Sequence, residues 1–289
     1  MSGGISRRTL FAASGAALLL ACISKPVPGA KAHRLVRRGD RLFLPARING
    51  TQVEALLDSA AETSIADAAF AQRIGLGGGK QTKARGTGAG TVEAELVPHA
   101  TIEAAGVDVR DATVAVLDLG DVARRLIGGR LDLIVGREIF DQSALLIDIA
   151  DGTIRPLAPG EAPKGTRLPL VSDRGNELMP VRIEGQDAQA TFDLGNGSGI
   201  LVSKSFAEAH LLDGRPTGER KGGGIGGEHA RRTLVLRSLE LAGRRFENIE
   251  AAIDDTETAT AANVGVGLLS RFTITADYPN RAVWLDAIR

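Results

Sequence analysis

Hydrophobic and polar residues alternate with a period of two along much of this chain, which is typical of half-buried β-strands. The clearest alternation covers residues 91–97, 107–117, 233–241 and 246–253. Residues 65–74 and 201–211 have instead the wider apolar spacing of short amphipathic helices. The pattern therefore predicts a mainly β protein with a few short helices.

Two hairpins are marked by the residues at their turns. Runs 41–48 and 52–57 flank Asn49-Gly50, and an Asn-Gly pair between alternating runs is a strong signal for a type I′ turn. Runs 178–183 and 187–192 flank Glu184-Gly185 in the same way. We therefore expect two equivalent hairpins.

The two hairpins belong to a longer internal repeat. At an offset of 135, residues 45–58 and 180–193 share six identities in fourteen positions, where chance predicts roughly one. The identical pairs are Pro45/Pro180, Arg47/Arg182, Ile48/Ile183, Gly50/Gly185, Ala55/Ala190 and Asp58/Asp193. At an offset of 136, the pairs are Phe70/Phe206, Gly86/Gly222, Gly88/Gly224, Gly90/Gly226 and Ala94/Ala230. The chain is therefore predicted to hold two copies of one β-rich unit.

Residues 155–176 separate the two copies. This segment contains four of the eleven prolines, namely Pro156, Pro159, Pro163 and Pro169. Because proline blocks helices and central strands, we expect a linker that lies over the surface. The predicted division is a first lobe at 33–157, a Pro-rich linker at 158–176 and a second lobe at 177–289.

The N-terminal thirty residues have the order of an export signal. Ser6-Arg7-Arg8-Thr9-Leu10-Phe11 resembles a bacterial twin-arginine signal, and the apolar stretch after it is too short to span a bilayer core of about 30 Å. Leu19-Leu20-Ala21-Cys22 resembles a lipobox, in which the cysteine is lipidated. Residues 1–30 are therefore predicted to be an export signal and tether, placing the protein in the periplasm with a lipid anchor at Cys22. An ordinary secretory signal, cut nearer Ala30, is the alternative.

Composition narrows the function classes. Lys plus Arg and Asp plus Glu each number 35, so there is no basic excess for a nucleic-acid backbone. The eight Phe, one Trp and one Tyr are too few for a stacking platform that binds single strands. A single cysteine excludes an intrachain disulfide and a cysteine-ligated metal. The histidines, His33, His99, His210 and His229, lack ligand spacing. No nucleic acid, metal or cofactor is therefore expected.

Two aspartates occupy equivalent places in the two copies. Asp58 and Asp193 each follow an apolar strand and precede a turn of small residues. A single aspartate in such a place is usually an Asx-turn or helix-capping residue. Because the repeat supplies one in each copy, the two carboxyl groups can converge on one axis.

The residues around Asp58 resemble a known family. Asp58-Ser59-Ala60-Ala61 after an apolar strand is similar to the Asp-Thr/Ser-Gly-Ala motif of retropepsin-like aspartic proteases. The order of elements is also similar, with a hairpin, the aspartate motif, a glycine-tipped flap and an apolar-apolar-Gly segment before a short helix. The resemblance implies two tandem retropepsin-like β-barrel lobes related by a pseudo-twofold axis. One chain, and hence a monomer, would carry both lobes that retroviral enzymes assemble from two chains.

The resemblance also implies a reaction. Asp58 and Asp193 would form a catalytic dyad that hydrolyses peptide bonds of a peptide or protein substrate. Two carboxylates about 3 Å apart repel by on the order of 5 kcal/mol at an effective dielectric of about 20, so they share one proton. The ionised member takes a proton from the attacking water, and the protonated member hydrogen-bonds to the peptide carbonyl.

Supporting residues follow from the same resemblance. The dyad loops would contain Ser59, Ala60, Leu194 and Gly195, and the substrate-binding flaps would carry Gly86, Gly88, Gly90, Gly224 and Gly226. A nucleotide-binding interpretation of these glycines fails, because residues 91–97 alternate like a strand and do not open a helix. Plain hairpin turns are the alternative to flaps.

Three residues depart from the family's pattern. Ala60 replaces the motif glycine, which costs about 1 kcal/mol or more if this residue needs a positive φ. Leu194 replaces the Thr or Ser whose hydroxyl braces the dyad in the family, and Asn196 stands where a small apolar residue is usual. The alternative function is therefore a non-catalytic, lipid-anchored binding or scaffold protein that retains the protease fold.

Overall fold

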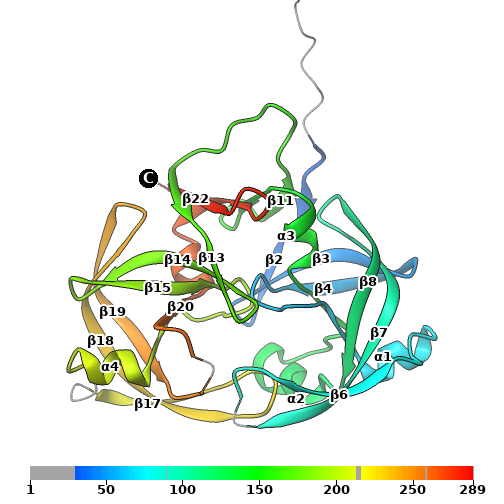
Figure 1. The fold of residues 1–289 in the computed structure, drawn as a ribbon, viewed down its shortest axis with the longest axis horizontal. Helices are drawn as coiled ribbons and strands as arrows, with labels where there is room; N and C mark the ends of the chain where they lie inside the picture. The colour runs from blue at the N-terminus through cyan, green and yellow to red at the C-terminus, as the bar shows by residue number, and fades with distance from the viewer. Residues whose placement is uncertain (1–29, 89, 213–215, 258, 289) are drawn as a thin grey trace, which may run out of the picture.

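The computed structural model describes residues 30–88, 90–212, 216–257 and 259–288. The fold is mainly β, as predicted, with two similar lobes joined by a third sheet (Figure 1). The predicted export signal, including Arg7, Arg8 and Cys22, lies outside the described residues. No helix within the described ranges is long and apolar enough to cross a membrane.

Each lobe is built on one eight-stranded sheet, and the strand order is the same in both. The first lobe has the order β2-β3-β4-β9-β5-β8-β7-β6, and an extra pairing of β3 with β7 closes the sheet on itself. Its strands are β2 Val36–Arg38, β3 Arg41–Ile48, β4 Thr51–Leu57, β5 Ile65–Asp67, β6 Lys80–Arg85, β7 Thr91–Ala104, β8 Val107–Leu117 and β9 Leu133–Val135.

The second lobe has the order β13-β14-β15-β20-β16-β19-β18-β17, with the equivalent extra pairing of β14 with β18. Its strands are β13 Val171–Asp173, β14 Asn176–Ile183, β15 Gln186–Phe192, β16 Ile200–Ser203, β17 Pro216–Gly222, β18 His229–Leu241, β19 Arg244–Asp254 and β20 Ala262–Val264. The internal repeat of the sequence is therefore a repeat of this folding unit.

The predicted hairpin turns are confirmed. Asn49 and Gly50 both have positive φ, 46° and 77°, between β3 and β4. Glu184 and Gly185 have φ of 52° and 80° between β14 and β15. Positive φ at both central residues defines the type I′ turn, whose twist matches that of the flanking strands.

The third sheet has six strands that come from both halves of the chain. In sheet order they are β1 His33–Arg34, β11 Thr153–Pro156, β10 Leu145–Asp148, β21 Phe272–Asp277, β22 Ala282–Ala287 and β12 Thr166–Pro169. Its central pairing joins β10 to β21, with Ile147 opposite Ile274. In Figure 1 this sheet lies at the top, at the opposite end of the molecule from β6 and β17. The lobes therefore share a sheet in addition to the connecting segment.

The proline-rich segment at 158–176 contains no helix. Its two short strands, β12 and β13, each lie at the edge of a sheet. Edge strands tolerate proline because one row of their backbone groups needs no partner strand. Pro156, also in the predicted segment, is the last residue of β11, which lies between β1 and β10, so the expectation that the prolines exclude central strands is wrong there. It is tolerated because β1 pairs only with Thr153 and Ile154.

Two predicted helices begin later than expected. Within 65–74 and 201–211, the first residues are strands β5 and β16, and the helices α1 Ala68–Arg73 and α4 Lys204–Ala209 follow them. The reason is capping: Asp67 accepts the Phe70 N–H and Ser203 accepts the Phe206 N–H, both at 3.1 Å, so each helix starts after its cap. The other helices are α2 Gly120–Val122, the π-helical turn η1 Ala123–Ile127, α3 Glu138–Gln142 and α5 Val266–Leu269.

The ladders also correct one pairing in the repeat. Equivalent pairs in the two lobes are Leu96/Ala115 and Thr233/Ala252, and Ile65/Ala115 and Leu201/Ala252. Leu96 and Ala115 therefore correspond to Thr233 and Ala252, at an offset of 137 residues. At this offset Ala94 corresponds to Arg231, so the predicted equivalence of Ala94 with Ala230 is wrong. Because successive side chains of a strand face opposite ways, the one-residue difference changes the face. Ala94 and Arg231 are buried, whereas Ala230 is exposed.

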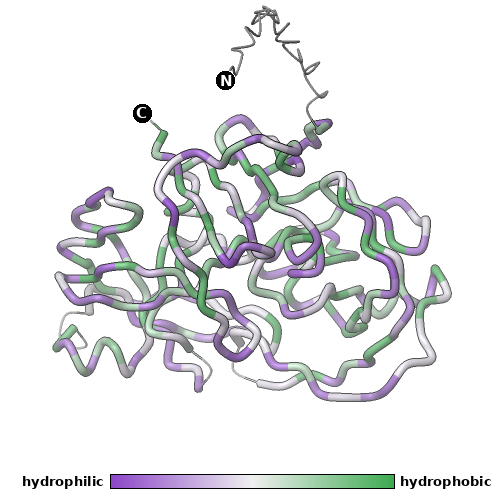
Figure 2. The backbone as a smooth tube through the Cα atoms, turned by 45° about the horizontal axis from the view of Figure 1, so that its top comes forward, coloured by the Kyte–Doolittle hydropathy of each residue, from purple (hydrophilic) through white to green (hydrophobic). Residues whose placement is uncertain are grey.

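Most of the buried apolar residues form one core that runs through both lobes and the shared sheet, including Phe140, Phe192 and Phe272. A second apolar cluster lies in the first lobe alone: Phe43, Leu56, Ala94, Leu117, Leu119, Val122, Ala123, Leu131 and Ile134. Figure 2 shows the alternation of hydrophobic and hydrophilic residues along the strands that produces this partition.

Truncating the centre of the shared sheet should destabilise the whole chain. Ile147 is fully buried between Ile154 and Ile274, so Ile147→Ala should lower the free energy of unfolding by about 2–5 kcal/mol. Urea unfolding, followed by far-UV circular dichroism and by the fluorescence of the single Trp284, measures this change. Val171→Ala is the control: its side chain is 53% exposed, and it should change stability by less than about 0.5 kcal/mol. Equal effects of the two changes would contradict the prediction.

Candidate active site

The two aspartates lie at equivalent strand ends. Asp58 follows β4, and its N–H donates to the Val135 carbonyl on β9 at 3.0 Å. Asp193 follows β15, and its N–H donates to the Val264 carbonyl on β20 at 3.1 Å. Each acid is therefore fixed by a neighbouring parallel strand of its own lobe.

Each carboxylate is held in an Asx-turn. Asp58 Oδ1 accepts the N–H groups of Ala60 at 2.9 Å and Ala61 at 3.1 Å. Asp193 Oδ1 accepts those of Gly195 at 2.8 Å and Asn196 at 2.9 Å. The second oxygen of each carboxyl is left free of these turn contacts. The Asx-turn and the paired-acid interpretations are therefore compatible, since one oxygen serves the turn.

Gly195 brings the two acids together. While its N–H binds Asp193, a Cβ at Gly195 would overlap Cγ and Oδ2 of Asp58. The Asp58 carboxyl therefore packs directly on the backbone that holds the other acid. The Asp58 side chain and the loop that follows Asp193 therefore lie next to each other where the two lobes meet.

Both acids have raised pKa values. Burial is the main cause at Asp58, followed by the charge of Asp193, and together they raise the pKa of Asp58 to about 7. Burial likewise raises the pKa of Asp193, but hydrogen bonds from Asn263, Asn196 and Gly195 oppose the shift. The environment thus favours the proton on Asp58 and the negative charge on Asp193.

Asn263 distinguishes the two acids, and sequence reasoning missed it. Its Nδ2 donates to Asp193 Oδ2 at 2.7 Å, and its Oδ1 accepts from Asn196 Nδ2 at 2.7 Å. Asn263 lies on β20 and pairs with Thr191 of β15. At the equivalent place in the first lobe, Ile134 of β9 pairs with Leu56 of β4. The signal was present in the repeat, because a polar residue stands where the other copy has isoleucine.

Ser59 braces the junction from one side. Its hydroxyl donates to the Phe192 carbonyl and accepts the Leu194 N–H, each at 2.9 Å. Leu194, the equivalent residue of the second lobe, is fully buried but has no hydroxyl to return the contact. The brace that the family makes in both directions is therefore made once.

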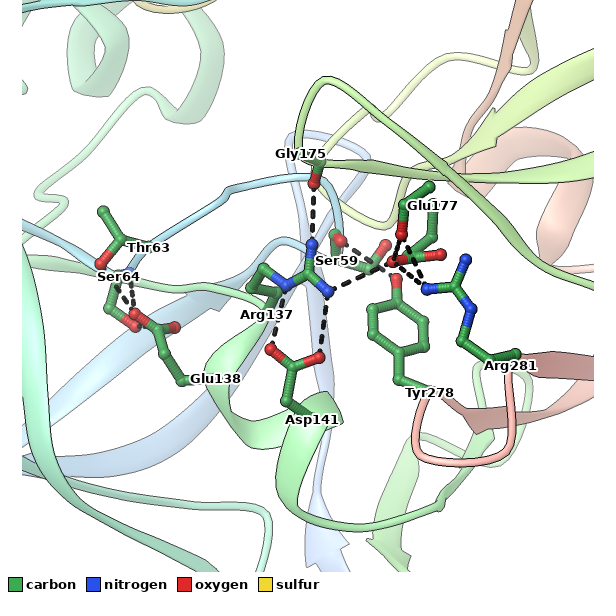
Figure 3. Close-up of polar contacts among 11 residues, drawn as sticks. Ser59, Thr63, Ser64, Arg137, Glu138, Asp141, Gly175, Glu177, Tyr278 and Arg281 are labelled. Carbon is green, nitrogen blue, oxygen red and sulfur yellow. Dashed lines mark hydrogen bonds and ion pairs between the residues drawn. The ribbon is translucent and has the colours of Figure 1, made fainter.

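Tyr278, a residue that the sequence analysis did not single out, supplies a second contact. Its buried hydroxyl donates to the Ser59 carbonyl at 3.1 Å, from the turn after β21 (Figure 3). Burial raises the pKa of this phenol. A hydroxyl from the second half of the chain thus holds the loop after Asp58. It belongs to Tyr278, in the turn after β21, and not to the position of Leu194, where the family has it.

A charged network surrounds this contact. Arg137 lies between Asp141 and the buried Glu177, and Arg281 also binds Glu177, at 3.0 Å (Figure 3). The Arg137 N–H donates to the Ala61 carbonyl at 3.0 Å, at the end of the first dyad loop. The network therefore ties this loop to β14, which contains Glu177, and to the turn between β21 and β22, which contains Arg281.

Glu138 supports the same loop from the other side. Its carboxylate accepts the Thr63 hydroxyl, the Ser64 N–H and the Ser64 hydroxyl, at 2.9, 2.6 and 2.9 Å (Figure 3).

Ala60, which replaces the glycine of the family motif, is not among the residues with positive φ. The strain that replacing the motif glycine would have caused is therefore absent at this position.

The predicted flap glycines lie at the tips of two hairpins, β6–β7 and β17–β18, and the tips touch. The N–H of Gly88 donates to the Ile225 carbonyl at 3.0 Å, and that of Gly90 to the Gly226 carbonyl at 2.9 Å. A Cβ at Gly86 would lie 2.9 Å from Ile225, and one at Gly224 would lie 2.7 Å from Thr87 Oγ1. The absence of side chains is what lets the two backbones approach.

Two arginines reinforce the contact between the hairpin tips. Arg125 of η1 donates to the Gly224 carbonyl at 3.0 Å and is paired with Asp121. Arg231 of β18 donates to the Thr87 carbonyl at 3.0 Å in the opposite direction. Each lobe therefore contributes one guanidinium to the hairpin of the other.

Arg41 is a further cation beside the acids. Burial lowers the pKa of Arg41, and the charges of Asp193 and Asp58 oppose the shift. Its Nη1 donates to the Gly39 carbonyl at 2.9 Å.

No group of three or more His, Cys, Asp or Glu suited to a metal ion occurs in the described parts of the chain. Two of the histidines, His99 and His229, pair with Asp111 and Asp255.

The architecture is that of a two-lobed aspartic protease, with one acid at the same strand end of each lobe. The model of the aspartyl protease family matches the chain twice, at residues 44–138 and 179–270, which is more than half of its length. The chain belongs to the aspartyl protease family. It is also similar to DNA damage-inducible protein 1 of Eremothecium gossypii, at 26% identity over 184 residues. That match covers 58% of this chain and 36% of the relative, so the chain spans about a third of the relative's length.

The raised pKa of Asp58 should make the protein less stable as pH rises. The pKa of Asp58 is about 7 in the folded protein, against 3.8 as its ordinary value. Between these two values the folded state holds a proton that the unfolded chain has lost, so the free energy of unfolding falls with rising pH, by on the order of 4 kcal/mol. Asp58→Asn should therefore be close to wild type at pH 4 and more stable at pH 8, in urea titrations.

Asp187→Asn is the control for that measurement. Asp187 is exposed, and a hydrogen bond from Arg182 lowers its pKa. Its removal should leave the fall in stability between pH 4 and pH 8 in place. Identical pH dependence of wild type and Asp58→Asn would show that the Asp58 carboxyl does not titrate as described.

Adding one methyl group at Gly195 should disturb the pair. The new Cβ would overlap the Asp58 carboxyl, so Gly195→Ala should lower the free energy of unfolding by about 1–3 kcal/mol. Gly199→Ala is a matched control in the same loop, since nothing lies within 4 Å of its added Cβ and its φ is not positive. Urea unfolding of both variants tests the contact, and equal stability would contradict it.

Proposed function

We propose that the chain is an aspartic-type endopeptidase that uses Asp58 and Asp193 as its catalytic dyad. The observation that carries the proposal is the position of Gly195, which touches the carboxyl groups of both Asp58 and Asp193. Membership of the aspartyl protease family supports the reaction class. The substrate would be a peptide or protein, and a single chain that supplies both acids can act as a monomer without a cofactor.

The hydrogen bonds assign the two acids different roles. Asp193 accepts from Asn263 and stays ionised, so it takes a proton from the attacking water while the water oxygen bonds to the peptide carbon. Asp58 carries the shared proton and donates it to the carbonyl oxygen, which gives a neutral tetrahedral diol. The diol collapses when Asp193 passes its proton to the departing nitrogen and Asp58 recovers a proton from a diol hydroxyl.

The two hairpins act as flaps in this proposal. Their tips are joined by the bonds Gly88 to Ile225 and Gly90 to Gly226. A peptide that reaches the acids from that side requires the tips to separate first, and closure over the peptide then excludes water. The glycines allow the close contact because they add no side chains of their own to it.

The alternative function is a non-catalytic binding or scaffold protein with the same fold. Its support is Leu194, which lacks the hydroxyl that the family uses. The contacts of Ser59 and Tyr278 reduce that support, because the dyad loops are held together through other hydrogen bonds. Export to the periplasm, with a lipid at Cys22, remains a proposal based on residues 6–22 of the sequence alone.

Digestion of an unbiased peptide library tests the enzyme reading. Wild type and Asp187→Asn, a control on the strand that precedes Asp193, should cut the same bonds. Asp58→Asn and Asp193→Asn should each reduce kcat/KM by at least a hundredfold, because each removes one proton-transfer group. Activity should also decline as pH rises above about 7, where Asp58 loses its proton. Equal cleavage by all four proteins, or none by folded wild type, would refute the dyad.

A further inference from the structure

The two lobes differ in chemistry at equivalent positions of their sheets. Four equivalent positions show this. In the first lobe they are Leu56, Ala94, Leu117 and Ile134, and in the second lobe Thr191, Arg231, Asp254 and Asn263. Every apolar residue of the first set is replaced by a polar or charged one.

The first-lobe set is filled by the chain itself. All four residues belong to the second apolar cluster, together with Leu119, Val122 and Ala123 from the segment that contains α2 and η1. Ile225, at the flap tip of the second lobe, packs against the same cluster. This side of the cleft is therefore apolar and has little room for polar groups.

The second-lobe set is covered as well, but its partners are polar, such as Thr260 for Thr191 and Thr256 for Asp254. Thr191, Arg231 and Asp254 are 4%, 6% and 6% exposed, so the polar groups are buried rather than solvated. Thr191 and Asn263 are paired on adjacent strands, and Asn263 binds Asp193 directly. Arg231 spans from β18 to the Thr87 carbonyl of the opposite flap. Buried polar groups of the second lobe therefore connect Asp193, through Asn263, and the flap of the first lobe, through Arg231.

Arg231 has hydrogen-bonding capacity that the chain does not use. Its Nε is buried and has no partner among the described residues. Its contact with Asp254 is long, 3.5 Å, and the same Asp254 oxygen is engaged by the Thr256 N–H and hydroxyl at 3.2 and 2.9 Å. Its other contact is with Thr87 on a flap, which is lost when the flaps separate. Buried donors without partners are costly, so an incoming acceptor is favoured.

We propose that Arg231 is a specificity-determining residue that binds the carboxylate of an Asp or Glu side chain in the peptide substrate, on the second-lobe side of the scissile bond. The planar guanidinium matches a carboxylate with two parallel hydrogen bonds. Arg41, beside the dyad, adds positive charge to the same cleft. This inference rests on the proposed function for the path of the peptide, between the acids and the flaps.

Paired peptides that differ only in Glu or Gln at one position test the inference. The position is found by scanning each residue on either side of the bond that wild type cleaves in the library. Wild type should prefer Glu by at least tenfold in kcat/KM, at positions on one side of the bond only. Arg231→Gln should reduce the preference to about one, chiefly by raising KM for the Glu peptide, and Arg231→Lys should restore part of it.

Arg232→Gln is the matched control. Arg232 is the next residue of β18, and its side chain faces the other way, so the same loss of charge should leave the preference intact. Arg231→Gln leaves Asp254 buried without its counter-ion, so the double variant Arg231→Gln/Asp254→Asn provides a second form without that charge. Thermal unfolding confirms that the variants are folded before their kinetics are compared.

A binding measurement separates this inference from the proposed function. Fluorescence polarisation with the same labelled Glu and Gln peptides, scanned over all positions on Asp58→Asn, does not depend on cleavage. Cleavage without a Glu preference would overturn the role of Arg231 and leave the endopeptidase in place. A Glu preference in binding that depends on Arg231, with no cleavage by wild type, would overturn the endopeptidase and support the acidic-peptide site. The absence of any Arg231-dependent preference in either measurement would overturn the inference.

Discussion

Removing a carboxylate from water costs several kcal/mol even after the surrounding protein relaxes, and this chain holds the buried Asp193 and the partly buried Asp58 against the same glycine. The rest of the site can be understood as the response to that cost. Four backbone N–H groups in two Asx-turns stabilise the acids, two for each. The turns keep their geometry only if the lobes stay in register, and this requirement falls on Ser59, Tyr278 and the shared sheet.

A duplicated fold need not remain symmetric once both copies lie on one chain. The hydroxyl contact across the junction survives from Ser59 to the second lobe, while Leu194 makes no return contact. The Tyr278 hydroxyl reaches the first dyad loop instead, in a setting of buried charge around Glu177. The acids have diverged as well, since Asn263 binds only Asp193. In an enzyme made of two identical chains every such change would appear twice, at both acids.

Local signals in the sequence were sufficient for much of the fold. Asn49-Gly50 identified a turn, and the apolar run before Asp58 identified the strand that positions it. The shared sheet could not be predicted in this way, because Ile147 and Ile274 pair across more than a hundred residues and no local pattern records the contact. Aligning the glycines of the two copies also could not predict which residues of the flap strands are equivalent. The loop from Gly222 to His229 is one residue longer than the loop from Arg85 to Thr91. That single residue decided whether Ala230 or Arg231 faced the cleft.

A peptide has a direction, and a cleft with two identical halves cannot distinguish one direction from the other. Here the apolar set and the set with Arg231 differ at four equivalent positions, so only one orientation of an acidic peptide pairs its carboxylate with the guanidinium. The same orientation decides which side of the scissile bond lies next to Asn263 and the ionised Asp193. Arg231 also bonds the opposite flap at Thr87, so a substrate carboxylate that takes over this donor would remove one of the contacts that hold the flap tips together. The Arg231 guanidinium would then both bind the substrate carboxylate and hold the flap tips together. Binding of an acidic side chain would therefore favour separation of the flaps.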